Sequence, residues 1–124
     1  MAEPGNTIVN ECGVLLSTVV GVRERDGYFD IYMDAGKPTG LKTDHKRLPS
    51  YINVINKDRI GVPIKYRFID LTCMHRPHFI YELPFMIEAG DILEFGGMGA
   101  YSVCLQSIFH LWSSPQIYLL DDEE

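Results

Sequence analysis

Residues 14–33 read VLLSTVVGVRERDGYFDIYM. The first part, Val14–Val22, is long and rich in β-branched side chains, which favours a strand buried on both faces. Asp26-Gly27 follows, and this dipeptide is the strongest short signal for a hairpin turn. Tyr28–Met33 is then predicted to be the return strand. The stretch therefore indicates a β-hairpin near the start of a mainly β protein.

The rest of the chain continues this pattern. Further strands are expected at Tyr51–Ile55, Gly61–Leu71, Asp91–Phe95 and Gln116–Leu120, and residues 37–50 are expected to be an exposed loop. One helical turn is expected at Ile8–Cys12. A short helix is expected after residue 99, because Ala100, Val103, Cys104, Ser107, Ile108 and Leu111 recur at helical spacing. The predicted fold class is a small β-barrel or sandwich with one or two short helices, since closure removes exposed sheet edges.

One stretch, residues 90–102, has an unusual density of glycine. An apolar strand runs into Gly96, Gly97 and Gly99, and Tyr101 follows immediately. A plain turn needs only one or two glycines. We therefore expect another group to approach the backbone closely at this point.

Composition excludes several classes of partner. The chain has 124 residues, enough for one domain, and a formal net charge of −6. This balance argues against nucleic acid and anionic membranes, whose sites need clustered Lys and Arg. The three cysteines follow no disulfide spacing, and we find no leader or long apolar run, so a cytoplasmic protein is expected. The acidic residues 121–124 are expected to form a solvated tail.

Several short motifs, in order along the chain, resemble a known family. They are Glu3-Pro4-Gly5, Asp34-Ala35-Gly36, Thr72-Cys73, Leu83-Pro84 with Gly90-Asp91, and Gly99-Ala100-Tyr101-Ser102. Together they resemble the C-terminal β-domain of the fold-type III pyridoxal-phosphate (PLP) decarboxylases, which act on ornithine, diaminopimelate or arginine. The Asp-Ala-Gly turn is more similar to the diaminopimelate branch.

The resemblance implies a partner. In this family a (β/α)₈ barrel carries the lysine that holds PLP, and the β-domain completes an active site at the interface of a head-to-tail dimer. Residues 1–124 would thus be a single domain in which residues 1–7 belong to the end of a barrel. The chain would need a barrel domain or subunit, would form a homo- or hetero-oligomer, and would be inactive alone.

Three residues match cofactor positions of the family. Glu3 matches the partner of the pyridine nitrogen, Gly5 lies where the backbone approaches the phosphate, and Tyr101 matches the tyrosine that contacts the phosphate. Asn6 replaces the arginine that grips the phosphate, and it carries no charge. The alternatives are a frayed terminal turn at Glu3 and an aromatic packed on the barrel at Tyr101.

Cys73 matches the family cysteine that returns a proton to the substrate carbon after CO₂ leaves. The alternative is a cysteine that only fills space in the core. Cys73, His75 and His78 could also be metal ligands, but no fourth ligand follows at a recognisable spacing. No metal site is therefore predicted.

The predicted substrate-binding residues are Lys42, Arg76 and Phe109. Lys42 lies where the diaminopimelate branch places an arginine for a substrate carboxylate, although an exposed solubilising lysine is an alternative. The family's carboxylates after the cysteine are absent, and Arg76 stands there instead, which favours an acidic or neutral amino acid. Phe109 matches a pocket aromatic or is a core residue, and His110-Leu111 replaces the family's Asn-Gly.

Three interpretations follow. The chain could be the β-domain of a PLP-dependent decarboxylase, contributing to a shared active site. It could be a stand-alone, non-catalytic binding or regulatory module derived from that family. It could also be an unrelated small β-barrel, because fold does not fix function.

Overall fold

The hairpin predicted from residues 14–33 is present in the computed structural model, which describes residues 1, 4–44, 46–72, 74, 77 and 79–120. Strand β1 (Val14–Arg25) pairs antiparallel with β2 (Tyr28–Met33). Asp26 and Gly27 both have positive φ, at 55° and 76°, the backbone of a type I′ turn. The turn signal in the sequence therefore set the register of the first two strands.

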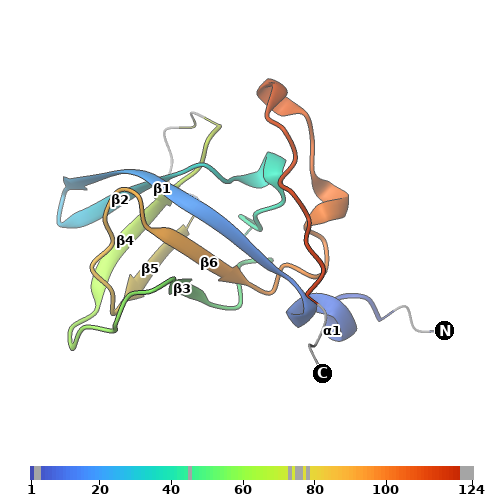
Figure 1. Ribbon diagram of the computed structural model, residues 1–124, viewed down its shortest axis with the longest axis horizontal. Helices are drawn as coiled ribbons and strands as arrows, with labels where there is room; N and C mark the ends of the chain where they lie inside the picture. The colour runs from blue at the N-terminus through green and yellow to red at the C-terminus, as the bar shows by residue number, and fades with distance from the viewer. Residues whose placement is uncertain (2–3, 45, 73, 75–76, 78, 121–124) are drawn as a thin grey trace.

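In the described part of the chain, six strands form one sheet in the order β3-β6-β1-β2-β4-β5, which curls into a nearly closed barrel (Figure 1). The remaining strands are β3 (Ile52–Val54), β4 (Ile64–Ile69), β5 (Phe79–Leu83) and β6 (Ile92–Gly96). Only the β2–β4 pair is parallel among these strand pairs. The predicted mainly β fold is confirmed, and β5 is a strand that the sequence analysis missed.

Aromatic side chains fill the barrel interior. The Phe68 ring lies 5.1 Å from that of Phe79 and 6.2 Å from that of Phe95, between ring centroids. The Phe79 and Phe95 rings are also 6.2 Å apart, although their strands β5 and β6 are not neighbours in the sheet. These contacts across the interior hold the curled sheet together, because offset and edge-to-face aromatic pairs add to burial.

A buried ion pair fixes the parallel pairing. Asp30 of β2 is fully buried and bonds to Arg67, its register partner on β4, while Arg25 lies 3.3 Å from its second carboxylate oxygen. Arg67 also lies over the Tyr28 ring, 5.0 Å from its centroid. Two guanidinium groups thus compensate a carboxylate that has no access to water.

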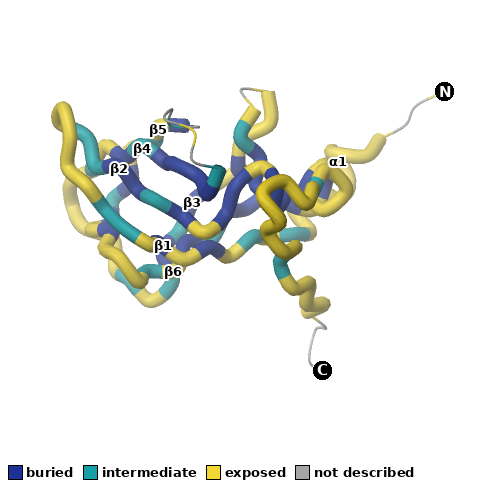
Figure 2. The backbone as a smooth tube through the Cα atoms, turned by 90° about the horizontal axis from the view of Figure 1, so that it is seen from above, coloured by how far each residue is buried: buried dark blue, intermediate teal, exposed yellow. Residues whose placement is uncertain are grey.

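The prediction that Val14–Val22 is buried on both faces is wrong. Inward-facing Ser17 and Val19 are buried, whereas Val14, Leu16 and Val20 on the other face are exposed (Figure 2). Ile92 on the adjacent β6 is exposed as well. One side of β1 is therefore an apolar outer surface.

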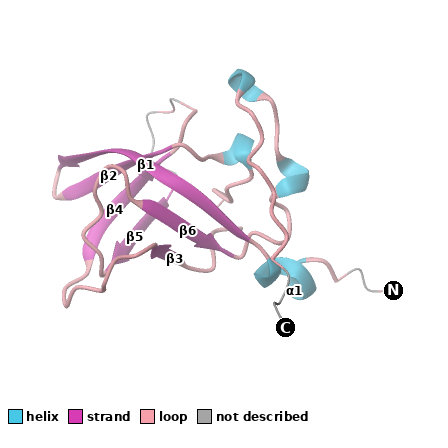
Figure 3. Ribbon diagram, in the orientation of Figure 1, coloured by secondary structure: helices cyan, strands magenta, loops and turns pink. Residues whose placement is uncertain are grey.

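The predicted helix after residue 99 and the predicted strand at Gln116–Leu120 are also wrong. The described part of that segment has only two 3₁₀ turns, η3 (Val103–Leu105) and η4 (Phe109–Leu111), and otherwise irregular backbone (Figure 3). Near the start of the chain, α1 (Asn6–Val9) and η1 (Asn10–Cys12) form short helical turns, as expected. None of the helices in the described ranges is long and apolar enough to span a membrane.

The expectation of an exposed loop at residues 37–50 holds only for part of it. The 3₁₀ turn η2 (Lys37–Thr39) leads into a buried run that includes Leu41 and Lys42. Thr39 Oγ1 accepts a hydrogen bond from the Gly36 N–H at 2.9 Å, which secures this turn to the end of β2. The segment packs against the loop that carries the clustered glycines, through hydrogen bonds from Lys42 to Gly97 O and from Ser102 to Gly40 O. These contacts place it at the candidate site.

The close approach expected at the clustered glycines is made by the chain's own N-terminal turns. The Gly99 N–H donates to Asn10 O at 2.9 Å, and the Met98 N–H donates to Gly13 O at 2.8 Å. A Cβ at Gly99 would lie 1.7 Å from Val9 O, and one at Gly13 would lie 2.8 Å from Gly99 N. Only hydrogen atoms fit between these two backbones.

We predict that Gly99→Ala lowers the free energy of unfolding by about 3 kcal/mol, because the added methyl would overlap the Val9 backbone carbonyl and force the two segments apart. Gly61→Ala is the control, since a Cβ there meets nothing within 4 Å, and its effect should stay below about 1 kcal/mol. Urea denaturation of both variants measures the difference. Equal stabilities for the two variants would show that the contact is not tight.

Candidate functional site

Tyr101 follows the loop that contains Gly96, Gly97 and Gly99, called the glycine loop below. This loop contacts the N-terminal turns α1 and η1. The Tyr101 hydroxyl oxygen is 3.7 Å from the position that a Cβ of Gly5 would occupy. Tyr101 has φ of 52°, a left-handed conformation that is uncommon for a bulky side chain and is often found at functional sites. The structure thus brings together Gly5 and Tyr101, two residues assigned to the cofactor from opposite ends of the sequence.

Lys42 is buried, so the alternative of an exposed solubilising lysine is wrong. Its side chain is only 6% exposed, and its Nζ donates hydrogen bonds to Asn10 Oδ1 and to Gly97 O, each at 2.5 Å. Burial lowers the pKa of Lys42, and the positive charge of Arg47 lowers it further, while Glu11 opposes the shift. The ammonium group therefore ties the N-terminal turns to the glycine loop.

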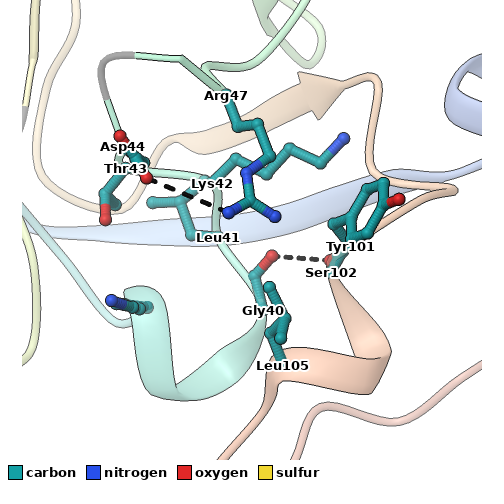
Figure 4. A pocket seen from close by; sticks show the side chains of 10 residues that line it. Gly40, Leu41, Lys42, Thr43, Asp44, Arg47, Tyr101, Ser102 and Leu105 are labelled. Carbon is teal, nitrogen blue, oxygen red and sulfur yellow. Dashed lines mark hydrogen bonds and ion pairs between the residues drawn. The ribbon is translucent and has the colours of Figure 1, made fainter. Parts of the chain in front are cut away.

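A pocket of about 270 Å³ opens beside these residues (Figure 4). Of the described residues, its wall carries three cationic side chains, Lys37, Lys42 and Arg47, and one carboxylate, Asp44. On one side, Ser102 Oγ donates to Gly40 O at 2.6 Å and so joins the loop after Tyr101 to the η2 turn. The pocket is therefore positively charged in a protein whose net charge is −6.

Arg47 is a pocket residue that the sequence analysis missed. A turn holds it in place, because the Arg47 N–H donates to Asp44 O at 2.7 Å. Its guanidinium carbon lies 5.1 Å from the centroid of the Tyr101 ring, a cation–π arrangement. No sequence motif surrounds Arg47, and only the folded loop shows that it meets a residue 54 positions away.

A larger pocket of about 430 Å³ lies against β1, β2 and the end of β4. Arg23, Arg25, Asp34 and Asp70 line it together with Trp112 from the C-terminal segment. Asp34 Oδ1 accepts bonds from Ser17 Oγ at 2.8 Å and from the Thr18 N–H at 2.7 Å. This carboxylate anchors the Asp-Ala-Gly turn to β1.

Phe109 lies in η4, outside the Tyr101 pocket. Its side chain is 53% exposed, so its alternative role as a core residue is wrong. His110 and Leu111 after it have φ of 56° and 59°. These are the positions of the family's Asn-Gly, and Asn and Gly adopt this left-handed backbone readily. His110 and Leu111 thus adopt a left-handed backbone that is less common for residues of their type.

The remaining predicted site residues, Glu3, Cys73 and Arg76, lie outside the described residues, so their roles stay predictions. His75 and His78, weighed with Cys73 as metal ligands, also lie outside them. Within the described ranges, no three His, Cys, Asp or Glu side chains are grouped so as to hold a metal ion.

Comparison with solved structures places this fold among amino-acid decarboxylases. The chain is similar to the lysine/ornithine decarboxylase from Vibrio vulnificus, with 27% identity, a TM-score of 0.76, and coverage of 98% of this chain and 33% of that enzyme. It is similar to the diaminopimelate decarboxylase from Helicobacter pylori, with 25% identity, a TM-score of 0.67, and coverage of 87% and 26%. It is also similar to the arginine decarboxylase of Paramecium bursaria Chlorella virus, with 24% identity and a TM-score of 0.74. This match covers 88% of this chain and 30% of that enzyme.

The resemblance stated from the sequence motifs is thus confirmed: the chain resembles one domain of the fold-type III PLP-dependent decarboxylases. No protein-family model matches the chain. The chain spans about a third or less of the length of these decarboxylases. The similarity therefore concerns part of such an enzyme.

We predict that Lys42→Met lowers stability at neutral pH by about 1–3 kcal/mol, because two buried acceptors lose their donor. The folded-state pKa of Lys42 is lowered, so above it the unfolded chain binds more protons and wild-type stability rises with pH. Lys42→Met lacks this dependence. The stability gap between the two proteins should therefore widen from that lowered pKa towards pH 10.5 in urea titrations. A gap that narrows over this range would contradict the burial of a charged ammonium.

Proposed function

We propose that this chain is the β-domain of a PLP-dependent amino-acid decarboxylase-like protein and that it supplies part of an active site to a (β/α)₈ barrel. The observation that carries the proposal is the pairing of Gly5 with Tyr101 beside a cationic pocket. The similarity to decarboxylases over most of this chain, but only a third or less of theirs, supports a shared site.

The described residues fit the phosphate end of PLP. Gly5 has no side chain that would keep a phosphate away from its backbone. The Tyr101 hydroxyl can donate a hydrogen bond, and the adjoining pocket is positively charged. When bound, PLP supplies the electron sink that decarboxylation needs. Glu3 would keep the pyridine nitrogen protonated, and the Cys73 thiol would deliver a proton to the substrate carbon.

The substrate is proposed to be an acidic or neutral amino acid. Arg76 would repel a basic distal group and attract an acidic one, and Phe109 remains a candidate contact through its exposed ring. Lys42 fits a direct role less well, because Asn10 and Gly97 already accept from its ammonium group. Its proposed contribution is the positive potential of the pocket wall.

The apolar outer surface of β1 is the proposed contact with the barrel. Val14, Leu16 and Val20 lie along it with Ile92 beside them, and each is more than 40% exposed. Unpartnered apolar surface of this kind marks interaction sites, so we expect a homo- or hetero-oligomer. We place the protein in the cytoplasm, where its exposed free thiols Cys12 and Cys104 would stay reduced.

A second candidate is a non-catalytic binding or regulatory module derived from the same family. The engagement of the Lys42 ammonium by Asn10 and Gly97 favours it, because two of the three N–H donors of that ammonium are already used and are lost to a substrate carboxylate. Such a module would bind the barrel without completing its chemistry.

We predict that the chain alone has no decarboxylase activity and that adding a family barrel that carries the PLP lysine produces it. Cys73→Ala should then lower kcat about 10²–10⁴-fold, as expected for the loss of a general acid. Cys104→Ala is the control, since that thiol is exposed and lies outside both pockets. Release of CO₂ from a panel of amino acids measures activity. Barrel binding without activity would favour the regulatory module, and activity of the chain alone would contradict the proposal.

We predict that Leu16→Lys weakens binding to the barrel at least about tenfold, because it places a charge in an apolar contact. The fold should tolerate it, since Leu16 is 56% exposed and its register partner is Glu94. Val62→Lys, at a position 70% exposed in a distant turn, is the control. Analytical ultracentrifugation compares the two, and equal binding would place the contact elsewhere.

A further inference from the structure

Two of the three cations in the pocket beside Tyr101, Lys42 and Arg47, differ in how many of their N–H donors are used by hydrogen bonds or ion pairs within the protein. The Lys42 ammonium makes two hydrogen bonds at 2.5 Å and is buried. Arg47 has a much weaker partner, because Asp44 is 4.0 Å away and both side chains are exposed, at 43% and 58%. Exposed ion pairs of this length contribute little. Arg47 therefore has donors to spare for a ligand, and unlike the exposed Lys37 it also lies against the Tyr101 ring.

The position of Arg47 suits recognition of an oxyanion. Its guanidinium carbon lies 5.1 Å from the centroid of the Tyr101 ring, and Figure 4 shows both side chains at the pocket. A cation–π contact uses the charge of the guanidinium and does not consume its N–H donors, which stay available for bidentate contact with an oxyanion. The backbone of the turn that carries Arg47 is held by the hydrogen bond from the Arg47 N–H to Asp44 O, so less backbone freedom of this turn would be lost on binding.

The charges of the described pocket lining do not balance. Among the described residues, the lining has three cations and one carboxylate, which gives a formal charge of +2. Glu11 does not line the pocket but offsets part of this charge at Lys42, whereas Arg47 and Lys42 repel each other. A ligand with about two negative charges, such as a phosphomonoester near neutral pH, would relieve this repulsion.

We propose that Arg47, with Tyr101, forms a phosphate-binding subsite in this pocket and supplies its ligand-directed positive charge. This role is separate from that of Lys42, whose ammonium holds the wall together. The inference rests on the proposed function only in taking the phosphate to be that of the cofactor. The same subsite would bind a free phosphate or another small phosphomonoester.

The test uses the 124-residue chain with inorganic phosphate, with pyridoxine 5′-phosphate, which has no aldehyde, and with acetate, all at constant ionic strength. NMR follows the Arg47 Nε–H signal and the amides of residues 99–102. We expect saturable shifts with both phosphates and much weaker ones with acetate. Arg47→Gln should weaken phosphate binding at least about tenfold, and Arg47→Lys should have an intermediate effect, since it keeps the charge but loses the fork.

Arg59→Gln is the matched control, because Arg59 is also an exposed arginine over an aromatic ring, Phe85, at 5.8 Å, but lies outside the pocket. Its phosphate binding should equal that of the wild type. Equal losses in the Arg47 and Arg59 variants, or no saturable shift in the wild type, would overturn the subsite. Phosphate binding by a chain that never becomes active with a barrel would keep this inference and remove the proposed function. Activity with the barrel, together with unchanged phosphate binding in Arg47→Gln, would keep the proposed function and overturn the role of Arg47.

Discussion

The backbone contact between the N-terminal turns and the glycine loop is the constraint on which the candidate site depends. Two hydrogen bonds, Met98 N–H to Gly13 O and Gly99 N–H to Asn10 O, join segments nearly ninety residues apart. The contact requires glycine because a Cβ at either position would overlap backbone atoms. Without it, the hydroxyl of Tyr101 would not lie beside Gly5. The site is therefore assembled by close backbone packing before any side chain contributes chemistry.

Charge is organised around this contact in two layers. Lys42 is buried in the pocket wall and bridges both segments through Asn10 and Gly97. Arg47 lies at the surface over the Tyr101 ring. A buried ammonium needs nearly ideal partners to offset its desolvation, whereas an exposed guanidinium keeps its donors available. The two cations thus suit different tasks, one structural and the other directed at a ligand.

The apolar periodicity of residues 100–111 gives a useful failure of sequence reasoning. The pattern has helical spacing, yet the described backbone forms only two short 3₁₀ turns there. Tyr101, His110 and Leu111 all have positive φ, which an α-helix cannot include. Apart from the buried Ala100, the apolar side chains of this pattern are exposed, with Ile108 at 77% and Leu111 at 88%. Apolar periodicity shows which side chains would gain from burial. Here it does not show whether this chain or a partner would cover those side chains.

Local chemistry let the sequence determine the hairpin, the mainly β class and the resemblance to the decarboxylase β-domain. Asp26-Gly27 is sufficient for its turn because the required backbone is set by two adjacent residues. The density of glycine at residues 96–99 also predicted that another group approaches the backbone closely there, but it did not predict which group. Only the tertiary structure decided that Val9 and Asn10 make this approach, that Lys42 is buried and that Arg47 meets Tyr101. Each of these depends on contacts between distant segments, and no local pattern encodes which segments will meet.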